Sequence, residues 1–152
     1  MKLYFDICCY SRFYDDQGQV KIYIESEAIL NIINIAKQNN YEIMGSPALD
    51  LEIEQIDKVE KREKIKYFYN QTITQKNDYN ENIYKRVKEL SEKTNIRTLD
   101  SFHLAFAENL KIDFLLTTDA RFEKACSRMD LNIKVINPIK YLMEVIHNDT
   151  NT

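Results

Sequence analysis

Four acidic residues lie at positions where their side chains could form one site. Asp6 and Asp119 each come at the end of a short apolar run, and Glu52 and Asp100 lie in segments with helical spacing. Clustered carboxylates repel one another, at a cost in stability, unless a cation neutralises them. A cluster of these four side chains would therefore bind a metal ion.

The residues available as ligands favour Mg²⁺ or Mn²⁺. The two histidines and three cysteines form no C-x-x-C or H-E-x-x-H motif, so we expect no zinc site. The sequence also has no calcium loop of the D-x-[DN]-x-[DN]-G type. Carboxylate oxygens suit Mg²⁺ and Mn²⁺, and one or two such ions activate a water and neutralise charge on a phosphodiester. The predicted chemistry is phosphodiester hydrolysis, with oxygen ligands alone.

Each acid also has a simpler explanation when it is considered alone. Asp100 and Asp119 stand at predicted helix starts, where a negative charge contributes about 0.3–1 kcal/mol. Glu52 fits a solvated helix face, and Asp6 fits a turn. Asp6 is the hardest to explain in this way, because we expect no helix directly after it to be capped. The functional interpretation therefore depends on the four positions together.

Apolar runs alternate with amphipathic segments along the chain. The runs predict strands at 2–6, 41–45, 112–117 and 133–136. Helical spacing and capping residues predict helices at about 24–39, 58–71, 79–93 and 99–110, with others starting at Ser46-Pro47, Asp119 and Asn137-Pro138. Strands separated by helices form right-handed crossovers, so we expect a three-layer α/β/α fold with a central parallel sheet of four or five strands.

The predicted topology brings most of the acids to one place. Ligands of such sheets bind beyond the carboxyl ends of the strands. Asp6, Asp119 and the start of the helix that carries Glu52 share this edge, and Asp100 joins them if its helix start faces it. We expect the segments 58–71 and 79–93 to form a helical pair that covers one side.

Length and composition describe one globular domain. The 152 residues are 44% hydrophobic and 30% charged, and a chain of this length buries ~68–70% of its unfolded surface. We expect one domain at 1–147 and a polar tail at 148–152. The chain has two glycines, too few for a glycine-rich nucleotide loop, and its net charge of -3 argues against a general polyanion binder.

The cysteine content and hydropathy predict the compartment. The chain has three cysteines, no signal-peptide pattern after Met1 and no apolar run of membrane-spanning length. We therefore expect a cytoplasmic protein that has no contact with a membrane.

Five segments resemble, in chain order, motifs of the PIN-domain ribonucleases, a family that includes the toxins of many prokaryotic toxin–antitoxin pairs. They are Leu3-Tyr4-Phe5-Asp6, Ser46-Pro47-Ala48-Leu49-Asp50-Leu51-Glu52, Leu99-Asp100-Ser101-Phe102-His103-Leu104-Ala105, Phe114-Leu115-Leu116-Thr117-Thr118-Asp119-Ala120-Arg121-Phe122 and Val135-Ile136-Asn137-Pro138. The resemblance implies a PIN-like fold and a Mg²⁺- or Mn²⁺-dependent ribonuclease directed at single-stranded RNA. It implies that Asp6, Glu52, Asp100 and Asp119 are the metal-binding and catalytic residues, with Glu54 as the alternative to Glu52.

The chain departs from the family pattern at two positions. Ile7 follows Asp6, where members often carry a small hydroxyl residue, and Ala120-Arg121 follows Asp119, where some members carry another acid. One metal ion or two ions are both compatible with this pattern.

Two further residues have open roles. Arg12, in a loop similar to that of one branch of the family, either binds a substrate phosphate or is solvated. His103 either orients Asp100, three residues before it, or packs in the core.

The resemblance also bears on partners. They would be an RNA substrate, an antitoxin protein and a second copy of the chain. The alternative function is that of a catalytically weak or inactive PIN-like module that binds RNA or protein, because a fold does not guarantee an activity.

Overall fold

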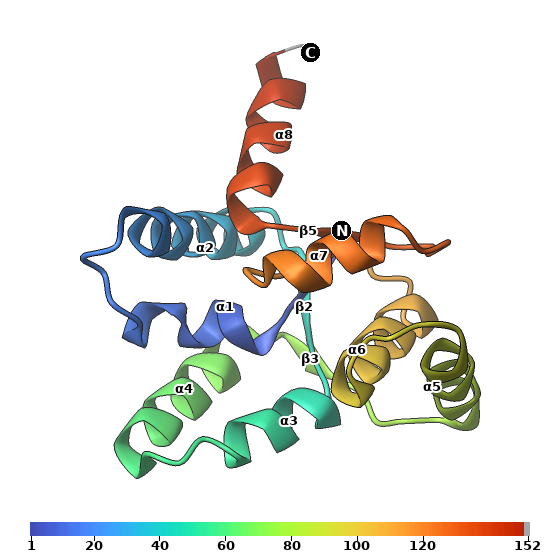
Figure 1. Ribbon diagram of the computed structural model, residues 1–152. Helices are drawn as coiled ribbons and strands as arrows, with labels where there is room; N and C mark the ends of the chain where they lie inside the picture. Colours follow the sequence, from blue (N-terminus) through green and yellow to red (C-terminus); the bar gives the residue numbers. More distant parts are fainter. Residues whose placement is uncertain (151–152) are drawn as a thin grey trace.

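Five short parallel strands form the centre of the protein in the computed structural model, which describes residues 1–150 (Figure 1). The strands are β1 (Lys2–Phe5), β2 (Glu42–Gly45), β3 (Gln75–Lys76), β4 (Phe114–Leu116) and β5 (Lys134–Ile136). Their order across the sheet is β3-β2-β1-β4-β5, and every pairing is parallel. The predicted parallel α/β sheet of four or five strands is confirmed.

Helices connect the strands and flank the sheet. They are α1 (Ile7–Ser11), the 3₁₀ helix η1 (Arg12–Tyr14), α2 (Val20–Gln38), α3 (Pro47–Glu54), α4 (Val59–Thr72), α5 (Glu81–Lys93), α6 (Thr98–Asn109), α7 (Ala120–Ser127) and α8 (Pro138–Thr150). Figure 1 shows α2 and α4 on one side of the sheet and α5 and α6 on the other, which gives the three layers.

The middle strands explain why the two faces must be covered. Leu3, Tyr4 and Phe5 of β1 and Leu115 and Leu116 of β4 are all fully buried. A strand that is apolar on both faces needs helices on both sides, as in α/β proteins. Phe5 pairs with Leu116, so the residues that follow β1 and β4 leave the sheet side by side.

Three local features differ from those expected. α1 and η1 follow β1 directly, where no helix was expected, and α2 begins at Val20 rather than at about residue 24. β3 is an edge strand of two exposed polar residues, so no apolar run marks it in the sequence.

The predicted pairing of the segments 58–71 and 79–93 is wrong. α4 packs against α1 and α3, whereas α5 packs along α6. Along the chain, β3 lies between α4 and α5. The chain crosses from one face of the sheet to the other at this strand (Figure 1). The two amphipathic helices therefore cover opposite faces.

The end of the chain is helical as far as the structure describes it. α8 runs to Thr150 and so overlaps the polar tail expected at 148–152, while residues 151–152 lie outside the described residues. The boundary of the domain stays a prediction. Within residues 1–150, no helix has both the length and the apolar character that a membrane crossing requires.

The close contact at Gly45 leads to a prediction about stability. A Cβ at this position would collide with the Tyr69 hydroxyl and would lie 2.8 Å from Ile73 Cδ1. Tyr69 cannot move freely, because its hydroxyl accepts a hydrogen bond from the Ser46 backbone N–H at 3.1 Å. We expect Gly45→Ala to lower the free energy of unfolding by about 1–3 kcal/mol, the usual cost of overpacking, as measured by urea denaturation.

Gly18→Ala is the matched control for this substitution. A Cβ at Gly18 would meet the exposed Asp16 side chain at 3.0 Å, and the Oδ1 of that side chain accepts a hydrogen bond from the Gly18 N–H at 2.9 Å. We expect a change within about 0.5 kcal/mol, as for most surface substitutions. Equal unfolding free energies for the two variants would show that the space around Gly45 is not closed.

Candidate metal centre

Asp6 lies at the carboxyl end of β1 and caps the short helix α1. Its Oδ1 accepts a hydrogen bond from the Ile7 N–H at 2.8 Å, and its Oδ2 accepts one from the Thr117 hydroxyl at 2.9 Å. The expectation that Asp6 has no helix to cap is wrong, because α1 begins at the next residue. A carboxylate offers about four lone-pair sites, so capping leaves this side chain, which is 6% exposed, able to bind a further partner.

Glu52 reaches the same point from α3. This helix begins after Ser46, as predicted, with the serine as its N-cap. The Glu52 side chain is 11% exposed and accepts a hydrogen bond from His103 Nε2. The Glu54 side chain is instead 56% exposed and pairs with Lys66 at 3.0 Å. Of the two glutamates considered, Glu52 is the one that lies beside Asp6.

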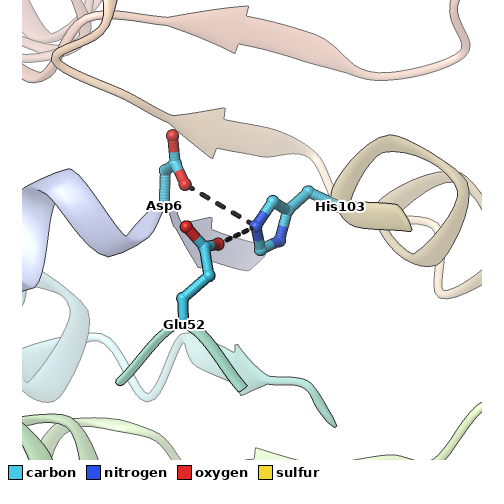
Figure 2. A group of neighbouring side chains, drawn as sticks. All are labelled: Asp6, Glu52 and His103. Atoms are coloured by element: carbon cyan, nitrogen blue, oxygen red, sulfur yellow. Dashed lines mark hydrogen bonds and ion pairs between the residues drawn. The ribbon is translucent and has the colours of Figure 1, made fainter. Parts of the chain in front are cut away.

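His103 completes the group from α6. Its ring is fully buried, and Nε2 bonds to Glu52 and lies 3.9 Å from Asp6 Oδ1 (Figure 2). The other ring nitrogen, Nδ1, is hydrogen-bonded to the Tyr4 hydroxyl at 2.5 Å. His103 therefore packs in the core, one of the two roles considered for it, and orients Glu52 rather than Asp100.

Opposing effects act on the pKa of His103. Burial lowers this pKa, but the hydrogen bond with Glu52 and the negative charge of Asp6 outweigh burial, and the pKa is raised above its ordinary value. Because an ionised carboxylate only accepts hydrogen bonds, Nε2–H is the donor to Glu52. The positive charge of a protonated His103 offsets the repulsion between the two carboxylates.

Asp119 caps α7 just beyond the end of β4. Its Oδ1 accepts hydrogen bonds from the N–H groups of Arg121 and Phe122 at 3.0 and 3.2 Å. The Thr117 hydroxyl, which donates to Asp6, also accepts a hydrogen bond from the Asp119 backbone N–H at 3.1 Å. Thr117 therefore links Asp119 to Asp6.

Asp100, in the first turn of α6, is paired with Arg97. Arg97 Nε and Nη2 each lie 3.1 Å from a different oxygen of the Asp100 carboxylate. The carboxylate is buried, whereas 67% of the arginine side chain is exposed. The guanidinium thus lies on the solvent side of Asp100 and neutralises it.

One group of side chains within residues 1–150 has the donor atoms and spacing for a metal ion: Asp6, Glu52 and His103, whose ligand atoms all lie within 4.8 Å of one another. Carboxylate oxygens suit Mg²⁺ and Mn²⁺, and imidazole nitrogen suits transition metals. These donors fit a divalent cation. Two of the four predicted acids thus lie together with a histidine that was not predicted as a ligand, and Asp100 and Asp119 lie outside this group.

Arg12, at the start of η1, is held by two carboxylates. Its Nε and Nη2 donate to Glu25 Oε1 at 3.0 and 2.7 Å, and its Nη1 donates to Asp15 Oδ2 at 3.0 Å. The other oxygen of Glu25 accepts a hydrogen bond from Asn137 Nδ2 at 2.6 Å. This network joins η1 to α2 and to the start of α8. A contact between Arg12 and an RNA phosphate stays a prediction.

Sequence reasoning did not assign a site role to Tyr4 or Thr117. Both are buried hydroxyl residues beside apolar strand residues: Tyr4 lies between Leu3 and Phe5 in β1, and Thr117 directly follows β4. A buried hydroxyl requires a hydrogen-bonding partner. That requirement is the signal in the sequence that could have identified them.

Residues 11–127 match the family model of the PIN domain. The chain therefore belongs to the PIN-domain family. The matched range includes Glu52, Asp100 and Asp119 and begins after Asp6.

Comparison with solved structures shows the same fold. The chain is similar to a crystal structure of VapBC2 from Rickettsia felis bound to a DNA fragment from their promoter, with a TM-score of 0.59 and 16% sequence identity. The similarity covers 90% of this chain and 98% of that chain. No curated protein matches the sequence.

Proposed function

We propose that the protein is a divalent-metal-dependent ribonuclease that hydrolyses RNA phosphodiester bonds with Mg²⁺ or Mn²⁺. The observation that best supports this function is the convergence of Asp6 and Glu52. These two carboxylates come from separate elements, are shielded from solvent, and meet at the carboxyl edge of a parallel sheet, where such folds bind ligands. Membership of the PIN-domain family supports the same chemistry.

Each acid has a place in this proposal. Asp6 and Glu52 hold the ion, Thr117 fixes the orientation of Asp6, and Asp119 is joined to Thr117 through its backbone N–H. When bound, a divalent ion supplies a nucleophilic water near neutral pH and neutralises charge on the phosphate. Asp100 becomes available as the fourth acid when its Arg97 partner binds another anion, such as an RNA phosphate.

The family resemblance supports a role as the toxin of a toxin–antitoxin pair. In this role an antitoxin protein covers the acidic edge, and a second copy of the chain forms a homodimer. A cytoplasmic location fits the free cysteines, Cys8, Cys9 and Cys126, because thiols stay reduced in that compartment.

The proposed activity is tested by incubating the purified protein with a labelled structured RNA in Mn²⁺, in Mg²⁺ and in EDTA. We expect cleavage with at least one of the two ions and none in EDTA. Asp6→Asn, purified in the same way, controls for contaminating ribonuclease and should give no cleavage.

Equal cleavage in EDTA, or equal cleavage by Asp6→Asn, would contradict the proposal. An absence of cleavage with either ion, together with an absence of Mn²⁺ binding, would favour the inactive interaction module instead.

A further inference from the structure

We propose that His103 Nε2 is itself a ligand of the divalent ion and that it makes the site select Mn²⁺ over Mg²⁺. This inference rests on the proposed function, since it concerns the same site, and it adds a nitrogen donor to a centre for which the sequence predicts oxygen ligands alone. It depends on the direction of the ring, on the partner of its second nitrogen and on the chemistry of the donors.

The ring of His103 points into the space between the two carboxylates. Figure 2 shows Nε2 facing both Asp6, which follows β1, and Glu52, which lies on α3. The ring is fully buried, and it packs against the Tyr4 ring with a centroid distance of 5.6 Å. A side chain held in this way loses little further conformational freedom when Nε2 binds an ion.

The second ring nitrogen has the kind of partner that a metal-bound histidine requires. Nδ1 is hydrogen-bonded to the Tyr4 hydroxyl, which in turn lies 2.7 Å from Ser46 Oγ. A tyrosine hydroxyl can donate one hydrogen bond and accept another. Nδ1–H can therefore donate to Tyr4 while the Tyr4 hydroxyl donates to Ser46. The Nε2 proton leaves to solvent, and its lone pair faces the ion.

The donor chemistry then determines which ion is preferred. Mg²⁺ takes oxygen ligands and keeps several of its waters. Imidazole nitrogen adds little for Mg²⁺ but binds the divalent first-row transition ions, among which Mn²⁺ binds such N/O sites most weakly. Two carboxylates with one imidazole thus form a site whose selectivity for Mn²⁺ comes from His103.

A competing role for His103 is to position Glu52 through the hydrogen bond alone. Loss of a positioning residue would lower the affinities for both ions to a similar extent, because Glu52 binds either of them. Loss of a nitrogen ligand would lower the affinity for Mn²⁺ more than the affinity for Mg²⁺. The ratio of the two affinities therefore separates the roles without any measurement of RNA cleavage.

The test compares Mn²⁺ and Mg²⁺ binding by calorimetry for the wild type, His103→Gln and His147→Gln. We expect His103→Gln to weaken Mn²⁺ binding at least about 10-fold and to change Mg²⁺ binding much less. His147→Gln alters the other histidine, which is exposed on α8, and should leave both affinities unchanged. Pulsed electron paramagnetic resonance of the bound Mn²⁺ should show coupling to a directly bonded imidazole nitrogen, and His103→Gln should remove it.

Tyr4→Phe provides a second variant in case His103→Gln does not fold. It retains the imidazole and removes the partner of Nδ1, so we expect nitrogen coupling to persist while Mn²⁺ affinity falls about 10-fold. Binding of both ions with an unchanged affinity ratio in His103→Gln and no nitrogen coupling in the wild type would overturn this inference alone. Failure of the wild type to bind either ion would overturn the proposed function as well.

Discussion

Glu52→Gln should reduce metal-dependent RNA cleavage at least about 100-fold, since a bound ion contributes several kcal/mol to the transition state and each 1.36 kcal/mol is a factor of ten in rate. The substitution keeps the shape of the side chain and removes its negative charge. It also retains an oxygen that can accept the hydrogen bond from His103. The expected loss is therefore one of charge and metal affinity rather than of folding.

Glu54→Gln is the matched control, because it makes the same change two residues along α3. Glu54 is exposed and paired with Lys66, and exposed pairs of this kind contribute about 0–1 kcal/mol. We expect its cleavage rate to stay within about two-fold of the wild type. A larger loss in Glu54→Gln than in Glu52→Gln would assign the second acid to Glu54 and contradict the site described above.

Arg12→Leu should lower the free energy of unfolding by about 3 kcal/mol, because it leaves Glu25 as a buried carboxylate without its cation. Glu25 is fully buried, and 19% of the Arg12 side chain is exposed, which places the expected cost at the lower end of the range for broken buried pairs. The loss should appear as a lower urea concentration at the midpoint of denaturation. Lys64→Leu, which breaks the exposed pair with Glu60, should change the free energy by less than about 1 kcal/mol.

The same variant separates the two roles considered for Arg12. A urea midpoint equal to that of the wild type, combined with weaker RNA binding, would show that Arg12 contacts substrate phosphate and that Glu25 tolerates its loss. A lower urea midpoint, with unchanged RNA affinity at a temperature where the variant is folded, would show that Arg12 stabilises the fold and does not contact RNA.

The positions of Asp6 and Glu52 can be predicted from the sequence alone. β1 is a short apolar run that ends in an acid, and Ser46-Pro47 is a strong helix start, so the elements that carry both residues were predicted. The carboxyl edge of a parallel sheet then brings the two residues together. Local patterns and one topological rule account for this part of the site.

Other features depend on contacts that no local pattern encodes. His103 was considered as a partner of Asp100 because the two are three residues apart on one helix, yet its partners are Glu52, Asp6 and Tyr4, which are distant in sequence. β3 has two polar residues that gain strand structure only by pairing with β2. Such features become visible only when the tertiary structure brings distant residues into contact.

Joint binding of a divalent ion by Asp6 and Glu52 is the step on which the proposed hydrolysis depends. Crystals of the wild-type protein soaked in Mn²⁺, with anomalous scattering measured at the manganese edge, test it most directly. We predict a peak within coordination distance of an oxygen from each of the two carboxylates. A saturated crystal with no anomalous peak at these carboxylates, or with peaks only at other acidic residues, would contradict it.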